Sequence, residues 1–533
     1  MTISRILLAS MILAPGPLIP IPIPIPIPIP LHGAQQTPAA GDVLWRSAFA
    51  TTDAGALARD WKGAGNADPA IDSGTLRLHA GTPGDRKLHR AIPLDGLRGG
   101  ALHVQARIRA QNVANKVNPW NGIKLMLQLD SAYGPSATIY PQADAGDGTF
   151  DWKTVNIVSS VPVTCREARL VIGLEQATGT VWFDDIEIKI LETGVTAVPG
   201  ATLREDNHYR GAPPPLLPRL RGAMVSTRAT KDDLRVLGQE WGANLIRWQL
   251  GMTHYPEGLE TPGFDRILDE ELRRLDTALS WCYEYGMYLV IDLHDLSRGL
   301  FANRANQDKL VALWQRLAAR YKDNPVVLGY DIANEPKLTR WSPGAQLWNG
   351  LSLRVARAIR EIDPAKPVII EPEYGGNPNG FITLLPVAVP NVIYSVHMYN
   401  PPAYTHNRIW QKTQKPETYP GDIAGRHWDK TTLLEELRPV IEFQKTCNAP
   451  IYVGEFSAIR WAPGADRYIS DLIDIFEELG WDWSYHAFRE SSVWSVEHGE
   501  DSNDNRPAAH PTAREKLLRA WFSKNQKPEW TGK

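Results

Sequence analysis

Cysteine is scarce in this sequence: its 533 residues include only Cys165, Cys282 and Cys447. An odd and sparse set of cysteines cannot supply the disulfide framework on which small secreted domains depend, so we expect no such framework. The fold must therefore rest on hydrophobic cores, and hydrophobic residues make up 43% of the chain. Because a chain of this length exceeds one ordinary domain, we expect two domains.

An excess of charge is also lacking, since 57 Lys and Arg residues face 60 Asp and Glu residues and the net charge is −3. Nucleic-acid-binding domains are usually basic because they neutralise phosphates, so this balance indicates no nucleic-acid partner. Beyond the N-terminal segment no apolar run is long enough to cross a bilayer, and we expect no membrane span. We expect the chain to act as a monomer.

The N-terminal segment is typical of export. Arg5 precedes the short apolar run ILLASMILA, as in a signal peptide, and an alternation of proline with isoleucine follows. Proline lacks a backbone N–H group and clashes with the preceding helical turn, so this repeat cannot form a membrane helix and should be extended. We predict a signal peptide with a Pro-Ile repeat over residues 1–34, and a secreted or periplasmic protein.

Residues 42–195 are predicted to form an all-β domain. Short alternating segments separated by turn residues indicate a β-sandwich or jelly roll. The predicted strands are 102–108, 122–128, 153–159, 168–173 and 180–190. The closing stretch GTVWFDDIEIKI resembles the last strand of carbohydrate-binding jelly rolls.

That resemblance implies aromatic side chains that stack on sugars. The candidates are Trp120, Tyr133, Tyr140 and Trp152. Each could equally fill a core or a turn, because aromatic rings serve both purposes. The domain could also do no more than support its neighbour. Two adjacent acids, Asp184 and Asp185, are candidates for a structural calcium site.

A second, α/β domain is predicted over residues 221–525, after a proline-rich linker at 196–220. Its predicted strands are 221–226, 244–250, 286–293, 326–333, 367–372, 392–397, 450–455 and 481–488. Helical periodicity separates them, most clearly in 265–285, 344–362 and 465–479. Eight parallel strands that alternate with helices make a (β/α)8 TIM barrel. A doubly wound open sheet is the alternative, but no Gly-rich phosphate loop follows the first strand.

Polar side chains gather at the carboxyl ends of these strands, where the chemistry of such barrels takes place. The polar residues there are Arg247, Asp292, His294, Asp295, Asn334, Glu335, Glu371, Glu373, His397, Tyr399, Glu455, Arg489, Glu490 and Trp494. Glu335 and Glu455 lie three strands apart, so their Cα atoms should be roughly 13 Å apart across the lumen. Their carboxyl groups then come to about 5–6 Å, close to the spacing of a retaining glycosidase, although an inverting pair is also admitted.

The barrel part resembles glycoside hydrolase family 5, a family of retaining β-glycosidases on this fold. The matching motifs are ANEP at 333–336, VGEF at 453–456, HMYNP at 397–401 and DLHD at 292–295, together with Arg247 and Trp494. The resemblance covers roughly residues 215–525. It implies that Glu335 is the acid/base and that Glu455 is the nucleophile that forms a glycosyl-enzyme.

The resemblance also implies which side chains set the ionisation of the two glutamates. Tyr399 would hydrogen-bond Glu455, Arg247 would lie beneath it, and His397 would lie close to Glu335. A positive charge and a hydrogen-bond donor lower the pKa of a carboxyl group, which suits the nucleophile. Once the glycosyl-enzyme has formed, that negative charge is gone, and the acid can release its proton and act as base.

The remaining implied roles concern the sugar. Asn334 would bind the 2-hydroxyl group, His294 would bind the same sugar, and Trp494 would form its stacking floor, with Trp483 as the competing candidate. No cofactor is implied. The DLHD stretch could suggest a metal site, but no further histidines converge on it, so we expect no metal.

The partner implied by the resemblance is a β-linked polysaccharide or oligosaccharide, and the leading function is an endo-β-1,4-glucanase. An endo-β-1,4-mannanase or another β-glycosidase of the family is the alternative. A non-catalytic glycan-binding protein is disfavoured, because both glutamates and their supports are present. The long loop 401–429 is a candidate for substrate contacts. Candidates for flanking sugar subsites are Trp341, Trp410, Trp428 and Trp461.

Overall fold

The computed structural model describes residues 39–47, 49, 57, 60–63, 67–118, 120–133, 137–194, 218–251, 257–294, 299–338, 341–409 and 415–532. The predicted signal peptide, most of the predicted linker, Asp295 and Trp410 lie outside these residues. Within the described ranges, no helix has the length and hydropathy needed to cross a membrane. All three cysteines are buried and none forms a disulfide.

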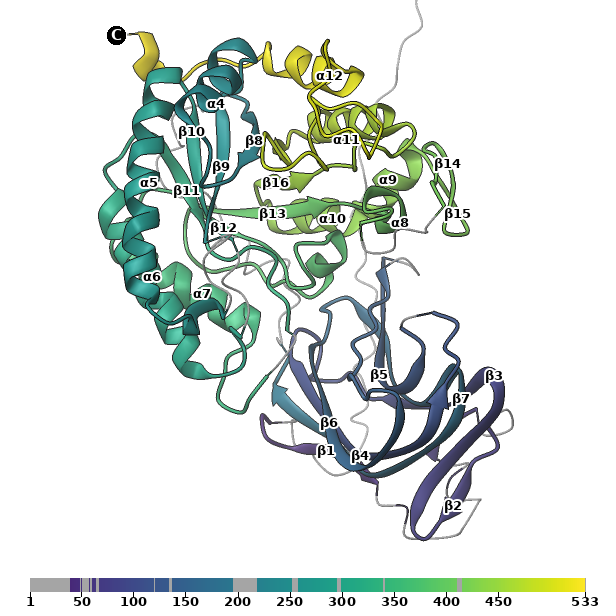
Figure 1. Cartoon of the computed structure of the whole chain (residues 1–533). Coiled ribbons are helices and arrows are strands. Elements are labelled where there is room, and N and C mark those ends of the chain that lie inside the picture. The colour runs from purple at the N-terminus through teal and green to yellow at the C-terminus, as the bar shows by residue number, and fades with distance from the viewer. Residues whose placement is uncertain are drawn as a thin grey trace, which may run out of the picture. The chain divides into compact units, whose positions relative to one another are not determined.

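Eight parallel strands close into a barrel, which confirms the predicted α/β fold (Figure 1). The strands are β8 (Arg221–Val225), β9 (Leu245–Leu250), β10 (Tyr288–Leu293), β11 (Val327–Asp331), β12 (Val368–Ile370), β13 (Val392–Met398), β16 (Ile451–Phe456) and β17 (Asp482–Tyr485). The last strand, β17, pairs with the first, β8, so the sheet has no free edge. Each strand lies within or overlaps one of the eight predicted ranges.

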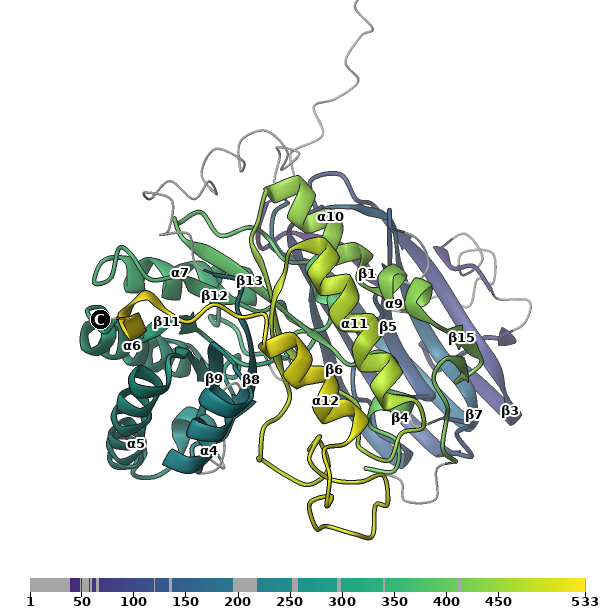
Figure 2. The same ribbon diagram turned by 90° about the horizontal axis from the view of Figure 1, so that it is seen from above.

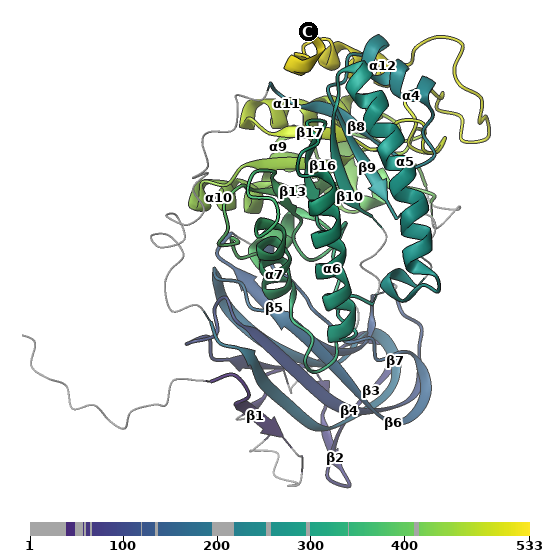
Figure 3. The same cartoon turned by 90° about the vertical axis from the view of Figure 1, so that its left-hand side faces the viewer.

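Helices surround this barrel. They are α4 (Lys231–Arg235), α5 (Phe264–Tyr285), α6 (Arg304–Tyr321), α7 (Trp348–Arg360), α8 (Pro402–Thr405), α9 (Lys430–Glu436), α10 (Arg438–Cys447), α11 (Ala465–Leu479) and α12 (Ala513–Phe522). Helices α11 and α12 pack side by side (Figure 2). Helices α5 and α6 also run side by side, and the ion pairs Arg316–Asp269 and Arg320–Asp276 join them (Figure 3). A short ribbon, β14 (Gly421–Ile423) and β15 (Arg426–Trp428), lies in the long loop after β13.

Most residues of the barrel strands are apolar because both faces of the strands are buried. Every residue of β9 and of β16 is buried, and the space between strands and helices holds one continuous hydrophobic core. Helix α5 contributes the face that its sequence period predicted, from Leu268 to Cys282. Gly286 and Gly480 end α5 and α11 in the left-handed conformation, with φ of 69° and 77°.

The N-terminal part of the described chain is all-β, as predicted, and has its own hydrophobic cluster. Its strands are β1 (Val43–Ser47), β2 (Ala70–Asp72), β3 (Thr75–Ile92), β4 (Ala101–Ala114), β5 (Gly122–Ser131), β6 (Gly148–Ser160) and β7 (Cys165–Glu192). The first half of β7 pairs with β5 and β3, and its second half pairs with β3, β4 and β1. The segments 168–173 and 180–190 are therefore one strand rather than two, and the jelly-roll assignment stays a prediction.

Candidate active site

The predicted site residues meet in a pocket of about 400 Å³ at the carboxyl ends of the barrel strands. Seven of them line it: His294, Asn334, Glu335, His397, Tyr399, Glu455 and Trp494. The eighth, Arg247, is fully buried and bonds to two of the others. The strand-end rule thus brings together side chains from six different strands and the turns that follow them.

The turn after β11 is built around Asn334 and Glu335. Glu335 adopts a left-handed backbone conformation with φ of 46°, which residues with a side chain seldom adopt. Its backbone N–H donates to Oε2 of Glu371 at 2.8 Å, and the backbone N–H of Asn334 donates to the carbonyl of Leu293 at 3.0 Å. These two bonds hold the strained turn so that both side chains reach the pocket.

Arg247 is the centre of a buried charge network. Its Nη1 donates to Oε1 of Glu455 at 2.8 Å, and its Nη2 donates to Oδ1 of Asn334 at 3.0 Å. The same guanidinium contacts Asp292, Asp331 and Glu371 at 2.7 to 2.9 Å. The planar fork of arginine, with its five donors, suits such a site because it can bind several oxygens at fixed angles.

Glu455 is held ionised by its surroundings. Burial alone would raise its pKa, but the positive charges of His397, His486 and Arg247 outweigh burial and hold the pKa of this carboxyl well below its usual range. The phenol of Tyr399 also donates to Oε2 of Glu455 at 2.8 Å. Both carboxylate oxygens are therefore engaged, one by a guanidinium and the other by a hydroxyl group.

Glu335 shares its proton with His397. Oε1 of Glu335 lies 3.2 Å from Nδ1 of His397, and Lys337 donates to Oε2 at 2.9 Å. Burial opposes ionisation of Glu335, but His397 and Lys337 together lower the pKa of its carboxyl. Burial likewise opposes the charge on His397, yet the charges of Glu371 and Glu455 and the bond to Glu335 raise its pKa well above the usual value. The free site thus places the shared proton on the imidazole.

His294 is a cation at neutral pH. Burial would lower its pKa, but the charge of Asp292 and the hydrogen bond from Nδ1 to Oδ2 of Asp292, at 2.7 Å, raise the pKa of His294 to about 9. Since Nδ1 faces Asp292, Nε2 is the nitrogen that can donate to a ligand in the pocket.

Trp494 forms part of the pocket wall. Its ring centroid lies 6.0 Å from that of Tyr399, 5.0 Å from that of His406 and 5.3 Å from that of His486. The competing Trp483 is fully buried in the barrel core, where its Nε1 donates to Glu477 at 2.9 Å. Of the two tryptophans, Trp494 alone borders the pocket.

Three histidine or lysine side chains of the pocket were not predicted: Lys337, His406 and His486. His486 directly follows β17, and its Nε2 lies 3.3 Å from Oε2 of Glu490. The strand-end rule could have found it. His406 lies in the loop after β13, where no periodic pattern marks a position.

Some predicted residues lie elsewhere. Glu373 does not line the pocket, and burial raises its pKa to about 7. Arg489 forms ion pairs with Asp233 and Glu497, at 2.9 and 2.8 Å, outside the pocket. Among the proposed subsite tryptophans that the structure describes, none lines the pocket; these are Trp341, Trp428 and Trp461.

Two groups of described residues bring three possible metal-ligand atoms within 4.8 Å of one another. They are Glu335 with His397 and Glu455, and Asp292 with Asp331 and Glu371. In the second group the guanidinium of Arg247 already lies against all three carboxylates and would repel a cation.

The candidate calcium ligands are also engaged. Asp184 and Asp185 lie 3.7 and 3.3 Å from Nη1 of Arg107, so a calcium ion would have to displace an ion pair. The expectation of a site without a metal stays a prediction.

The chain is similar to known proteins over its barrel. Endoglucanase C of Acetivibrio thermocellus is 27% identical over 255 residues, which cover 41% of this chain and 73% of that protein. Cellodextrinase A of Ruminococcus flavefaciens is 26% identical over 230 residues, or 40% of this chain and 66% of that protein. Among solved structures, Thermotoga maritima Cel5A in complex with cellobiose is 23% identical with a TM-score of 0.46, covering 61% of this chain and 100% of that one.

The chain also matches a family model. Residues 214–492 match the model of the cellulase family, glycosyl hydrolase family 5. This match spans more than half of the 533 residues, and it contains both glutamates of the pocket and the residues that bind them, while Trp494 lies just beyond its end. The chain therefore belongs to glycosyl hydrolase family 5 and is a glycoside hydrolase.

Proposed function

We propose that this protein is a retaining endo-β-1,4-glucanase, with Glu455 as nucleophile and Glu335 as acid/base. The observation that carries the mechanism is the short gap between them: one carboxylate oxygen of Glu335 lies within 4.8 Å of one of Glu455. Retaining enzymes hold their two carboxyl groups about 5–5.5 Å apart, whereas inverting enzymes leave about 6.5–9.5 Å for a water molecule. This close approach supports a double displacement.

In the first displacement, the ionised carboxylate of Glu455 attacks the anomeric carbon while Glu335 gives a proton to the glycosidic oxygen. The bond between that carbon and the glycosidic oxygen breaks, and a glycosyl ester of Glu455 forms. In the second displacement, water attacks the same carbon and gives its proton to Glu335, and the ester bond breaks. Two inversions at one carbon restore the original configuration and both carboxyl groups.

The proton for the leaving group comes from the pair of Glu335 and His397. In the free site the proton lies on Nδ1 of His397, 3.2 Å from Oε1 of Glu335. A glycosidic oxygen that approaches Glu335 competes for this proton. His397 then gives the proton to the carboxylate of Glu335, which gives a proton to the glycosidic oxygen. When the ester forms, Glu455 loses its charge, so Glu335 becomes the better base for the incoming water.

Other residues of the pocket would bind the sugar. Asn334 is fixed by Arg247 through its side-chain oxygen, so its amide N–H groups are free to point at a hydroxyl group. Cationic His294 offers Nε2–H as a donor. The ring of Trp494 offers an apolar face, on which the C–H face of a sugar ring can pack.

The choice of substrate rests on the relatives. Several of them are named endoglucanases and one a cellodextrinase, which supports a β-1,4-glucan. The N-terminal segment at residues 1–34 leads us to propose that the protein is secreted or periplasmic, and we propose that it acts as a monomer.

The mechanism is tested by the stereochemistry of the first product. Proton NMR during hydrolysis of an oligosaccharide should show the β-anomer before mutarotation, whereas an inverting enzyme gives the α-anomer. Glu455→Gln should bind oligosaccharide without turnover. Glu335→Ala should lose about 10²–10⁴-fold in rate on polysaccharide, the contribution of a general acid. With an aryl glycoside, whose leaving group needs no acid, azide should rescue Glu335→Ala and yield a β-glycosyl azide.

The substrate is tested with a panel of carboxymethyl cellulose, barley β-glucan, xyloglucan, glucomannan and galactomannan. Release of reducing ends from the two glucans, together with a rapid fall in their viscosity, would support internal cutting of a glucan. Activity on the mannans alone would agree with the proposed mechanism but would identify mannan as the substrate. Full activity of Glu455→Gln would overturn the nucleophile assignment.

A further inference from the structure

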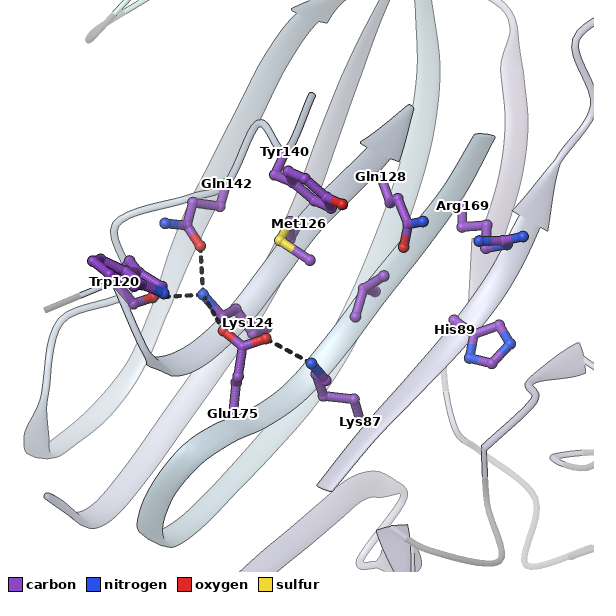
Figure 4. Close-up of a pocket in the computed structure, with 11 residues that line it drawn as sticks. Lys87, His89, Trp120, Lys124, Met126, Gln128, Tyr140, Gln142, Arg169 and Glu175 are labelled. Carbon is purple, nitrogen blue, oxygen red and sulfur yellow. Dashed lines mark hydrogen bonds and ion pairs between the residues drawn. The ribbon is translucent and has the colours of Figure 1, made fainter. Parts of the chain in front are cut away.

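A hollow of about 690 Å³ lies on one face of strands β5, β7 and β3, far along the chain from the catalytic glutamates (Figure 4). On β5 its floor is formed by Lys124, Met126 and Gln128, which alternate with the fully buried Leu125 and Leu127. Successive strand residues point to opposite faces, so this hollow is on the side of the sheet away from the core. It has no part in the reaction proposed for the barrel.

The middle of the floor is left open by a glycine. Gly173 of β7 is the cross-strand partner of Lys124 on β5 and of Lys87 on β3. It has a φ of 134°, and a Cβ atom there would come within 2.1 Å of the carbonyl oxygen of Arg86. Position 173 of β7 can therefore carry no side chain.

Two aromatic rings stand at the rim. Trp120 is 61% exposed and Tyr140 is 54% exposed. Only six large hydrophobic side chains are exposed among the described residues, and these are two of them. Exposed aromatic groups that flank a polar hollow mark a binding surface, because sugar rings and other flat ligands pack on them.

The other two predicted aromatics are placed differently. Tyr133 packs against the hydrophobic core, and the guanidinium groups of Arg107 and Arg109 lie over the half-buried ring of Trp152. The structure thus separates the four aromatic candidates of the sequence into two at the hollow and two elsewhere.

The position of Trp120 is fixed from below. Lys124 is a lysine that is only 2% exposed, and its Nζ donates to the carbonyl oxygen of Trp120 at 2.6 Å and to Oε1 of Gln142 at 2.7 Å. Its third partner is Oε2 of Glu175, at 3.0 Å. One buried ammonium group therefore ties the loops that carry Trp120 and Gln142 to the floor, so the hollow is preformed.

The cations of the hollow are paired with carboxylates. Lys87 and Lys124 share Glu175, at 2.6 and 3.0 Å, and Arg169 lies 3.3 Å from Asp130. An anionic ligand would have to compete with these ion pairs for its partners. Hydroxyl groups need no net charge and can use the amide and ammonium N–H groups and the carboxylate oxygens as they stand.

The binding surface continues beyond Trp120. A second hollow, of about 220 Å³, shares Trp120 and Gln142 with the first. Trp120 therefore borders both depressions. A ligand that fills both must be longer than one sugar ring.

We propose that this face of β5, β7 and β3 binds a single chain of a neutral polysaccharide, which packs on Trp120 and Tyr140 and hydrogen-bonds to the polar floor. A concave site with fixed rims accepts one chain, whereas the flat face of a crystal cannot enter it. The site would hold the protein on a polymer, and it does not depend on the proposed activity of the barrel.

The test uses the full chain with Glu455→Gln, so that the polymer is not cut. Retardation in native gels that contain barley β-glucan, glucomannan or polygalacturonate gives the apparent Kd for two neutral polymers and one anionic polymer. Adding Trp120→Ala and Tyr140→Ala should weaken binding to a neutral polymer roughly tenfold or more, since stacking on two rings is lost. The matched control, Trp152→Ala, removes a tryptophan of the same region outside the hollow and should leave the Kd unchanged.

A second readout separates this site from the barrel. With Glu455 intact, the Trp120→Ala and Tyr140→Ala variant should hydrolyse a small aryl glycoside at the unaltered rate and keep its melting temperature. An unchanged Kd in the double variant would overturn the proposal, as would an equal loss in Trp152→Ala or a preference for polygalacturonate. If the intact enzyme hydrolyses no glycoside, the proposed function fails, while the gels still report on this site.

Discussion

The hydroxyl group of Tyr399 donates a 2.8 Å hydrogen bond to Oε2 of Glu455, the oxygen that Arg247 leaves free. Burial and the charge of Glu455 raise the pKa of Tyr399 well above its usual value, so the phenol keeps its proton. The bond is strongest while Glu455 is ionised and weakens when the carboxylate becomes an ester. Tyr399 therefore positions the nucleophile in the state that attacks.

Tyr399→Phe should lower kcat/KM about 10- to 100-fold, because a hydrogen bond to a charged group contributes about 1.5–3 kcal/mol. The pKa of Glu455 should rise, and the acidic limb of the pH profile of kcat/KM should move to higher pH. Profiles with an aryl cellobioside would measure both effects. The control is Tyr404→Phe, which removes a buried hydroxyl that donates to the carbonyl of Pro463 at 3.0 Å. If both variants behave alike, Tyr399 has no special role.

His397→Gln should move the alkaline limb of kcat/KM to lower pH. In the intact enzyme the shared proton is retained until His397 deprotonates, at a pKa well above that of an ordinary histidine. In the variant, Glu335 alone must hold the proton, so the alkaline limb should fall toward the pH range in which a carboxyl group titrates. His406→Gln is the control: His406 also lines the pocket, but burial lowers its pKa to about 4 and it is neutral at these pH values. An unmoved limb in His397→Gln would contradict the shared proton.

His294 should make folding stability depend on pH in a definite direction. Its pKa is about 9 when folded and about 6.5 when unfolded, so the folded state binds the proton more tightly. The contribution, on the order of 2–3 kcal/mol, is fully present below pH 6.5 and is lost as the pH rises through 9. The difference in free energy of unfolding between the intact protein and His294→Gln should therefore shrink between pH 6.5 and 9.5. A constant difference would show that His294 is not charged.

Arg247→Met should destabilise the barrel by about 3–5 kcal/mol at neutral pH, because four buried carboxylates lose the cation they share. Chemical unfolding at pH 7 would measure it. Arg489→Met is a matched control, since its ion pairs with Asp233 and Glu497 are partly exposed and should contribute about 1 kcal/mol or less.

The barrel could be predicted from sequence because its strands are buried on both faces and end in polar residues. Several, such as β12 and β16, appear as mainly apolar runs, and the ends that carry Asn334, Glu335 and Glu455 identify the rim of the site. The all-β region was harder to predict. Strand β3 was missed because Gly81, Pro83 and Gly84 interrupt its alternation, yet it pairs with β7 on both sides of this interruption.

The remainder of the site depends on contacts between distant parts of the chain. Glu335 and His397 share a proton although they are 62 residues apart in the sequence. Oε1 of Glu335 and Nδ1 of His397 are 3.2 Å apart, and no local sequence pattern encodes this contact. His406 enters the pocket from an irregular loop, and Trp120 is held by a lysine buried on the outer face of a sheet. Such positions become visible only when loops and strands are placed together.

The contacts of Arg247 join both halves of the barrel, and they therefore affect whether the barrel can be split into fragments or recombined with another barrel. The arginine lies on β9, together with Asp292 and Asp331 on the next two strands, while Glu371 and Glu455 come from the second half of the barrel. A fragment that ends after β11 would keep the guanidinium without the nucleophile, and the complementary fragment would keep Glu371 and Glu455 without the guanidinium that contacts both. Half-barrels of this protein should therefore be insoluble alone and recover activity only on reassociation, and chimeras should tolerate exchange of outer helices far better than exchange of halves.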